Sequence, residues 1–131
     1  MNKVNKNFLN KTHHIADLKL CSIRLINNSK FPWIILIPKR KNINDLTELK
    51  AKDQILLMKE IVFSSKVMKK VFRTSKLNVE KIGNIVSQLH IHIIARFKSD
   101  SSWPHSVWVT KERPYTKELL LKTISRLKKL F

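Results

Sequence analysis

The sequence is poor in cysteine, glycine and proline, with one, one and four residues of these types among 131. A single cysteine, Cys21, excludes an internal disulfide and a cysteine-rich zinc site, and a lone thiol is typical of a reducing compartment. No run of about 18 residues is apolar throughout, which excludes a membrane span. The first residues, MNKVNKNFLNKTHH, lack the apolar core of a signal peptide. These absences predict a cytoplasmic protein without a membrane partner.

Acidic residues are also scarce, because nine Asp and Glu stand against 27 Lys and Arg, a net charge of +18. Such a charge attracts the phosphates of nucleotides and nucleic acids. The lysines are spread along the chain rather than gathered in an arm, and an AT-rich genome produces the same richness in Lys, Asn and Ile. A nucleic-acid partner therefore stays an alternative that the sequence does not favour.

The length and the 43% of hydrophobic residues are typical of one globular domain. We expect this domain to cover residues 1–131, with 1–14 as a polar N-terminal segment and 116–131 as a C-terminal helix capped by Thr116. The apolar periodicity predicts an α+β fold, an antiparallel sheet with helices packed on one face. The clearest strands are expected at 18–26, 33–37, 76–82 and 89–97, the first two as a hairpin, and a long helix at 48–72.

The most informative stretch is SQLHIHIIARF, residues 87–97. Its β-branched residues and its alternation predict a strand, on which side chains two residues apart share a face. Gln88, His90 and His92 therefore form a polar row above a buried apolar face.

A pair of histidines in such a row can perform nucleophilic chemistry on phosphorus. A neutral imidazole has a free lone pair that attacks, and a second imidazole can donate to a phosphate or leaving-group oxygen. Two alternatives stay open. The histidines could be solvated, or buried with their hydrogen bonds made, and have no functional role, or His-x-His could be the start of a metal site. A metal would need a third ligand from His105, His13 or His14.

The stretch GNIVSQLHIHIIAR, residues 83–96, resembles the signature of the histidine triad (HIT) nucleotide-binding proteins, in which three histidines alternate with apolar residues after a Gly-Gln or Gly-Asn step. RLINNSKFPWIILIPKR, residues 24–40, is similar to the nucleotide-side hairpin of that family. With the trailing Trp103-Pro104, the sequence looks closest to a bacterial branch that carries Gln-φ-His-φ-His in place of the full triad. The resemblance covers residues 15–109 and implies a HIT-like antiparallel sheet of about five strands with helices packed on one face.

This resemblance assigns roles to individual residues. His90 falls on the nucleophile that takes up the nucleotidyl group, and His92 on the histidine that contacts phosphate and helps the leaving group. Asn84 matches a residue that hydrogen-bonds phosphate. Asn27, or Asn28 in a shifted register, matches a residue near the ribose.

Two positions depart from the family pattern, since Gln88 replaces the first histidine and Trp33 stands where many members carry a supporting histidine. We place Gln88, together with Asn84 and Asn27, among the substrate-binding residues.

The resemblance implies a homodimer that hydrolyses or transfers nucleotides through a nucleotidyl-histidine intermediate. The implied substrates are nucleoside phosphoramidates or dinucleoside polyphosphates, and this chemistry requires no metal or cofactor. The two departures keep open a non-catalytic nucleotide-binding or regulatory protein.

Overall fold

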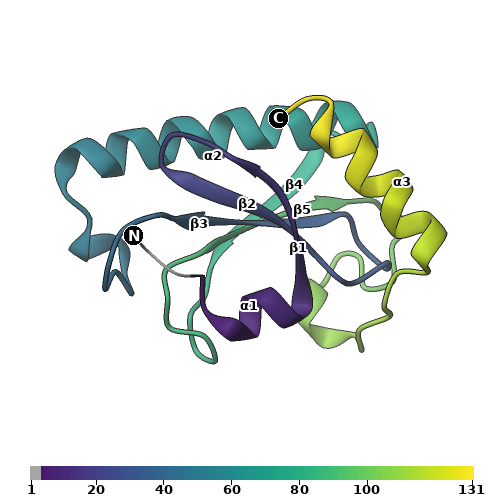
Figure 1. The fold of residues 1–131 in the computed structure, drawn as a ribbon. Helices are drawn as coiled ribbons and strands as arrows, with labels where there is room; N and C mark the ends of the chain where they lie inside the picture. Colours follow the sequence, from purple (N-terminus) through teal and green to yellow (C-terminus); the bar gives the residue numbers. More distant parts are fainter. Residues whose placement is uncertain (1–3) are drawn as a thin grey trace.

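A computed structural model describes residues 4–131 and contains a five-stranded antiparallel sheet in the order β1–β2–β3–β5–β4 (Figure 1). This sheet and its helices confirm the predicted α+β fold. The strands are β1 (Thr12–Asp17), β2 (Cys21–Ile26), β3 (Trp33–Pro38), β4 (Lys76–Lys81) and β5 (Ile91–Arg96). The helices are α1 (Lys6–Lys11), α2 (Ala51–Phe72) and α3 (Lys117–Lys128).

Strands β2 and β3 form the expected hairpin, but β2 begins three residues later than the alternation predicts. Leu18 donates its backbone N–H to the carbonyl of Cys21, which closes a turn at residues 18–21. The carboxylate of Glu60, on α2, accepts from the N–H groups of Leu20 and Cys21 at 2.8 Å each. The backbone therefore turns where the side-chain pattern alone suggests a strand.

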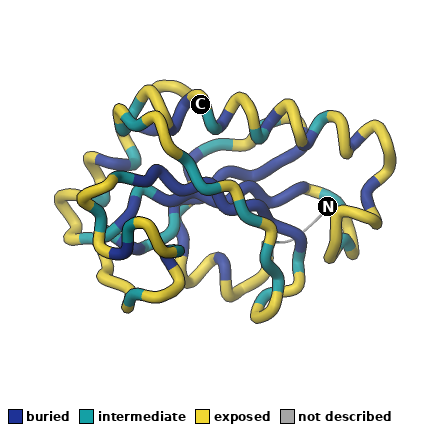
Figure 2. The backbone as a smooth tube through the Cα atoms, turned by 180° about the vertical axis from the view of Figure 1, so that it is seen from behind, coloured by how far each residue is buried: buried dark blue, intermediate teal, exposed yellow. Residues whose placement is uncertain are grey.

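Helices α2 and α3 cover one face of the sheet, as predicted. Leu57 and Met68 of α2 are buried in the same core cluster as Ile34 of β3 and Ile93 of β5. Leu127 of α3 is buried in this cluster as well. Figure 2 shows the strands as a buried layer and the helices with exposed outer sides. Within the described residues, no helix is both long enough and apolar enough to span a bilayer.

The Thr116 cap of α3 is present, because its side chain accepts from the N–H of Leu119. Helix α2 starts at Ala51 rather than at Glu48, since residues 46–48 form a separate 3₁₀ turn. It ends at Phe72, and the next residue, Arg73, caps it in a left-handed conformation with φ 52°.

The described part of the polar N-terminal segment, residues 4–14, has regular secondary structure. Of residues 1–14, the first three lie outside the described part of the chain, and the others include helix α1 and the start of β1. Helix α1 lies on the sheet face opposite α2 (Figure 1), where Phe8 packs against Ile35 and Ile37. Residues 4–14 therefore pack against the sheet as part of the fold.

Helix α1 crosses its face of the sheet diagonally. At its start, the N–H of Asn5 donates to Oε1 of Gln88, just before β5, at 2.9 Å. At its end, the carbonyl of Lys11 accepts from the N–H of Asn27, just after β2, at 3.0 Å. Because β3 lies between β2 and β5, α1 divides this face into two regions.

Candidate active site beside helix α1

His90 and His92 lie together on the sheet face that carries α1. Leu89, Ile91 and Ile93, between and beside them, point to the opposite face and belong to the core beneath α2. The two imidazole rings meet edge to face with centroids 4.7 Å apart. Only 6% of His90 and 4% of His92 are exposed. The alternation expected from the sequence therefore places two buried imidazoles in direct contact.

The proton of His90 is assigned by its backbone neighbour. Its Nδ1 lies 2.7 Å from the carbonyl oxygen of Gln88. A carbonyl oxygen only accepts hydrogen bonds, so Nδ1 carries the hydrogen and Nε2 keeps a free lone pair. Burial lowers the pKa of His90, and the hydrogen bond to Gln88 offsets this in part. His90 is therefore a neutral imidazole with a nucleophilic Nε2.

His92 has the opposite tautomer. The indole N–H of Trp33 donates to His92 Nδ1 at 2.9 Å. An indole nitrogen only donates, so Nδ1 holds the lone pair and Nε2 holds the hydrogen. Burial lowers the pKa of His92 to about 3, with a smaller contribution from His90. The pair thus presents a lone pair on one ring and an N–H donor on the other.

Aromatic side chains enclose this pair. Phe8 of α1 contacts the His90 ring with centroids 4.6 Å apart. On the other side, Trp108 contacts the rings of Trp33 and His92, with centroid distances of 5.0 and 5.3 Å. The indole N–H of Trp108 donates to Glu80 of β4 at 3.2 Å. This enclosure limits water around the histidines and keeps them neutral.

A buried ion pair supports the segment that carries Trp108. Arg96, at the end of β5, is 1% exposed and donates to both carboxylate oxygens of Asp100 at 2.8 and 3.1 Å. It also donates to the carbonyl of His105 at 2.7 Å. Burial alone would raise the pKa of Asp100, but hydrogen bonds from Arg96 and three backbone N–H groups lower it to about 2. Arg96 therefore fixes the loop after β5 beside the histidines.

The other predicted site residues are Gln88, Asn27 and Asn84. Gln88 holds the start of α1 with its side chain and His90 with its carbonyl. Asn27 follows β2, and its side-chain oxygen accepts from the N–H of Tyr115 at 3.0 Å. Asn84 is exposed in the connection between β4 and β5. The structure thus joins Gln88 to His90, while Asn27 binds the segment before α3 and Asn84 is exposed.

The role of Trp33 in the site was not predicted from the sequence. There, Trp33 was interpreted only as the loss of a supporting histidine. Its partner is readable from the strand pairing, since Trp33 lies opposite Ile94, two residues from His92 on the same face.

The structure does not assemble the metal site that His-x-His suggested as an alternative. Among residues 4–131, no three His, Cys, Asp or Glu side chains are grouped so that they could hold a metal ion. His105 is exposed in the loop after β5, and His14 pairs with Asp17 at 3.3 Å on β1.

Comparisons with known proteins agree with this arrangement. Residues 7–99 match the model of the HIT domain. A histidine triad protein from Bradyrhizobium japonicum has 32% identity and a TM-score of 0.94, over 98% of this chain and 96% of the other. One from Sinorhizobium meliloti 1021 has 34% identity, a TM-score of 0.94 and the same coverage. One from Marinobacter aquaeolei VT8 has 33% identity and a TM-score of 0.93, over 98% and 94%. No curated protein is significantly similar in sequence.

Proposed function

The chain belongs to the HIT domain family, and we propose that it hydrolyses or transfers nucleotides through a nucleotidyl-histidine intermediate. Its substrates in this proposal are nucleoside phosphoramidates or dinucleoside polyphosphates. The observation that carries the proposal is the pair of complementary tautomers, with the lone pair on His90 Nε2 and the hydrogen on His92 Nε2.

The proposed reaction has two steps. His90 Nε2 attacks the α-phosphorus, a P–N bond forms, and the bond from phosphorus to the leaving group breaks with its electron pair on that group. The His92 N–H donates to a phosphate or leaving-group oxygen, where negative charge develops. Water then attacks the same phosphorus, the P–N bond breaks with its electron pair returning to Nε2, and the nucleoside monophosphate is released. The proton that water gives up balances the one taken up by the departed leaving group, so that the sum is hydrolysis. The lowered pKa of both histidines keeps them neutral for this sequence at neutral pH.

The test is turnover of adenosine phosphoramidates and diadenosine polyphosphates by the wild type and by His90→Ala. We expect wild-type turnover and a loss of at least about a thousandfold in the variant, because the covalent intermediate cannot form. His92→Ala is expected to bind the same nucleotides with reduced kcat. A folded wild type that turns over none of these substrates would contradict the enzyme assignment.

A second candidate is a nucleotide-binding protein without catalysis. It is favoured by Gln88 in place of the first histidine and by the low exposure of the histidine pair, 6% and 4%. It predicts AMP binding that His90→Ala weakens, together with no product from any member of the substrate panel.

The same proposal includes a homodimer. Ile55, Met58 and Val62 follow one another on α2 at spacings of three and four and are 61%, 60% and 45% exposed. Strand β4 is an edge of the sheet, and its Val79 is 49% exposed. Exposed apolar stripes and open sheet edges both favour association. A second copy of the chain is the partner that we propose for this surface.

The cytoplasmic location expected from the sequence also stays a proposal. Its support is Cys21, which is fully buried and unpaired in the core. Burial raises the pKa of this thiol, so it is a core residue rather than a reactive one.

A further inference from the structure

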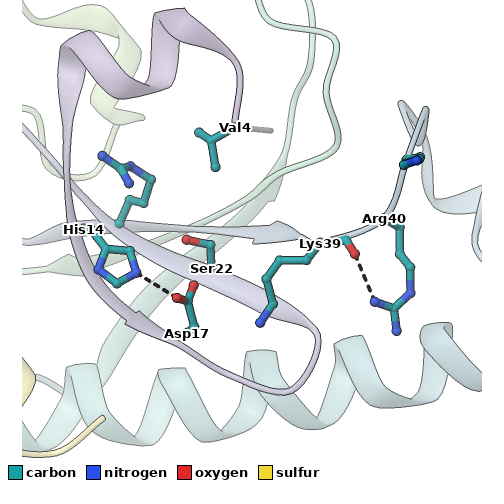
Figure 3. A pocket seen from close by; sticks show the side chains of 8 residues that line it. Val4, His14, Asp17, Ser22, Lys39 and Arg40 are labelled. Carbon is teal, nitrogen blue, oxygen red and sulfur yellow. Dashed lines mark hydrogen bonds and ion pairs between the residues drawn. The ribbon is translucent and has the colours of Figure 1, made fainter. Parts of the chain in front are cut away.

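Helix α1 separates the histidine pair from a second feature of the same sheet face, a cavity of about 690 Å³. The cavity lies over β1, β2 and the end of β3 (Figure 3). Ser22 lines it and pairs with Ile37 of β3, while His92 pairs with Ile35 of β3 from the other side. Two strand spacings, roughly 10 Å, therefore separate the cavity from the row of the histidines. Phe8 packs on Ile35 and Ile37, between the two regions.

The lining of the cavity is strongly basic. Four of its side chains are cations and one is a carboxylate, namely Arg24, Lys39, Arg40, Lys41 and Asp17. Arg40 is bound to Asp53 at 2.7 and 3.0 Å. Asp17 lies 3.3 Å from His14 and also attracts Arg24, so its single negative charge offsets one of the three remaining cations. Among residues 4–131, Arg24, Lys39 and Lys41 have no carboxylate within ion-pair distance. The cavity therefore carries positive charge that the fold itself does not neutralise.

Two buried side chains give the cavity a fixed floor. Ser22 and Arg24 are 4% and 8% exposed and point to the same side of β2. Arg24 donates through Nε and Nη2 to the hydroxyl and carbonyl of Thr12, at 2.6 and 3.3 Å, which orients its guanidinium. Ser22 and Arg24 both line the cavity. A guanidinium and a hydroxyl on one strand face can both donate hydrogen bonds to an anion that enters the cavity.

We propose that this cavity is a phosphate-binding site that is separate from the histidine pair. Arg24 and the Ser22 hydroxyl donate to the phosphate oxygens from the floor, and Lys39 and Lys41 neutralise their charge from the rim. Guanidinium and hydroxyl donors match phosphate oxygens well, and partial burial strengthens their attraction. The site accepts a free phosphate or pyrophosphate, or the terminal phosphate of a nucleotide.

The first experiment titrates sodium pyrophosphate into the protein by calorimetry at physiological salt. The variant is the double substitution Lys39→Gln, Lys41→Gln, which alters only exposed side chains. Its matched control is Lys122→Gln, Lys128→Gln on α3, which removes the same charge from exposed positions elsewhere. We expect the cavity variant to bind about tenfold more weakly, the size of one lost charge-assisted hydrogen bond, and the control to bind as the wild type does. Ser22→Ala is expected to weaken binding without any change of charge.

Two further arms separate this site from the proposed active site. His90→Ala is expected to bind pyrophosphate as the wild type does; loss of binding there would assign the anion to the histidine region and overturn the proposal. Equal weakening in the cavity and control variants would overturn it as well, because it would reveal only attraction to the overall charge. No measurable pyrophosphate binding by the wild type has the same consequence. If the cavity variant also loses affinity for AMP, the site holds the phosphate of the nucleotide; unchanged AMP affinity means that it holds a free phosphate.

Discussion

At the scale of single residues, the chemistry of the site depends on which nitrogen of each imidazole carries the hydrogen. Both assignments follow from partners with a single hydrogen-bonding role. The carbonyl beside His90 can only accept a hydrogen bond, and the indole N–H beside His92 can only donate one. The carbonyl belongs to the backbone of residue 88, so its hydrogen bond does not require a particular side chain there. This explains how glutamine can replace the first histidine while the neighbouring imidazole keeps its orientation.

Trp33→Phe tests the tautomer of His92. The variant keeps an aromatic ring but removes the donor to Nδ1, so His92 can place its hydrogen on either nitrogen. We expect kcat to fall by about tenfold or more with little change in KM, since general-acid and hydrogen-bond donors act mainly in the transition state. Trp108→Phe is the matched control, because its indole N–H is bound to Glu80 rather than to a histidine. Equal losses in both variants would show that only the packing of the rings matters.

The stability of the protein should respond to pH through the same histidines. The pKa of His92 falls from 6.5 in the unfolded chain to about 3 in the fold, and that of His90 is lowered as well. Between pH 6.5 and 3 the unfolded chain binds more protons than the folded one. The contribution of His92 to the free energy of unfolding is therefore fully present above pH 6.5 and is lost as the pH falls toward 3. Each histidine contributes a slope of up to about 1.4 kcal/mol per pH unit.

Urea unfolding measured between pH 7 and 4.5 checks this expectation, since most carboxylates stay ionised in that window. His92→Gln should have a shallower dependence of the free energy of unfolding on pH than the wild type. Parallel curves for the two proteins would contradict the lowered pKa.

At the scale of elements, the loop after β5 owes its position to one buried ion pair. Asp100→Ala leaves the Arg96 guanidinium, which is 1% exposed, without its carboxylate. Loss of one partner from a buried pair costs about 3–5 kcal/mol, so the free energy of unfolding should fall by that amount. Asp17→Ala removes a carboxylate that is 55% exposed and should change it by less than about 1 kcal/mol. Chemical denaturation of both variants measures the difference.

The elements that the sequence predicted are those whose apolar residues follow one period. Helix α2, helix α3 with its Thr116 cap and the hairpin of β2 and β3 have such patterns. Strand β1 does not, because a register shift lies between His14 and Ala16 and interrupts its alternation. Helix α1 buries a single residue, Phe8, which is too little to produce a helical period. Tertiary contacts with Ile35 and Ile37, rather than local pattern, hold it in place.

The same limit applies to the candidate site. Period-two alternation was sufficient to place His90 and His92 on one face, because strand geometry fixes that relation. The partners that set their tautomers are a backbone carbonyl, which accepts from His90, and an indole N–H on a neighbouring strand, which donates to His92, and neither has a local sequence signal. The cavity beside Arg24 combines β1, β2 and the end of β3, so it exists only once the sheet has formed.

At the scale of the whole molecule, the surface combines a net charge of +18 with an exposed apolar stripe on α2, formed by Ile55, Met58 and Val62. Two such chains repel each other at long range, while burial of the stripe favours contact at short range. Because salt screens only the repulsion, a dimer formed through this surface should become more stable as ionic strength rises. Binding to nucleic acid would have the opposite dependence.

Light scattering coupled to size exclusion tests this dimer. The wild type is expected to have twice the 15.5 kDa mass of one chain at micromolar concentration, more completely at high salt than at low salt. The double substitution Met58→Lys, Val62→Lys should give monomers, because it places two cations in the buried contact. Leu121→Lys is the control, since Leu121 is 58% exposed on α3, outside the stripe. A monomeric wild type at every salt concentration, or equal dissociation in the control, would show that the stripe does not bind a second copy.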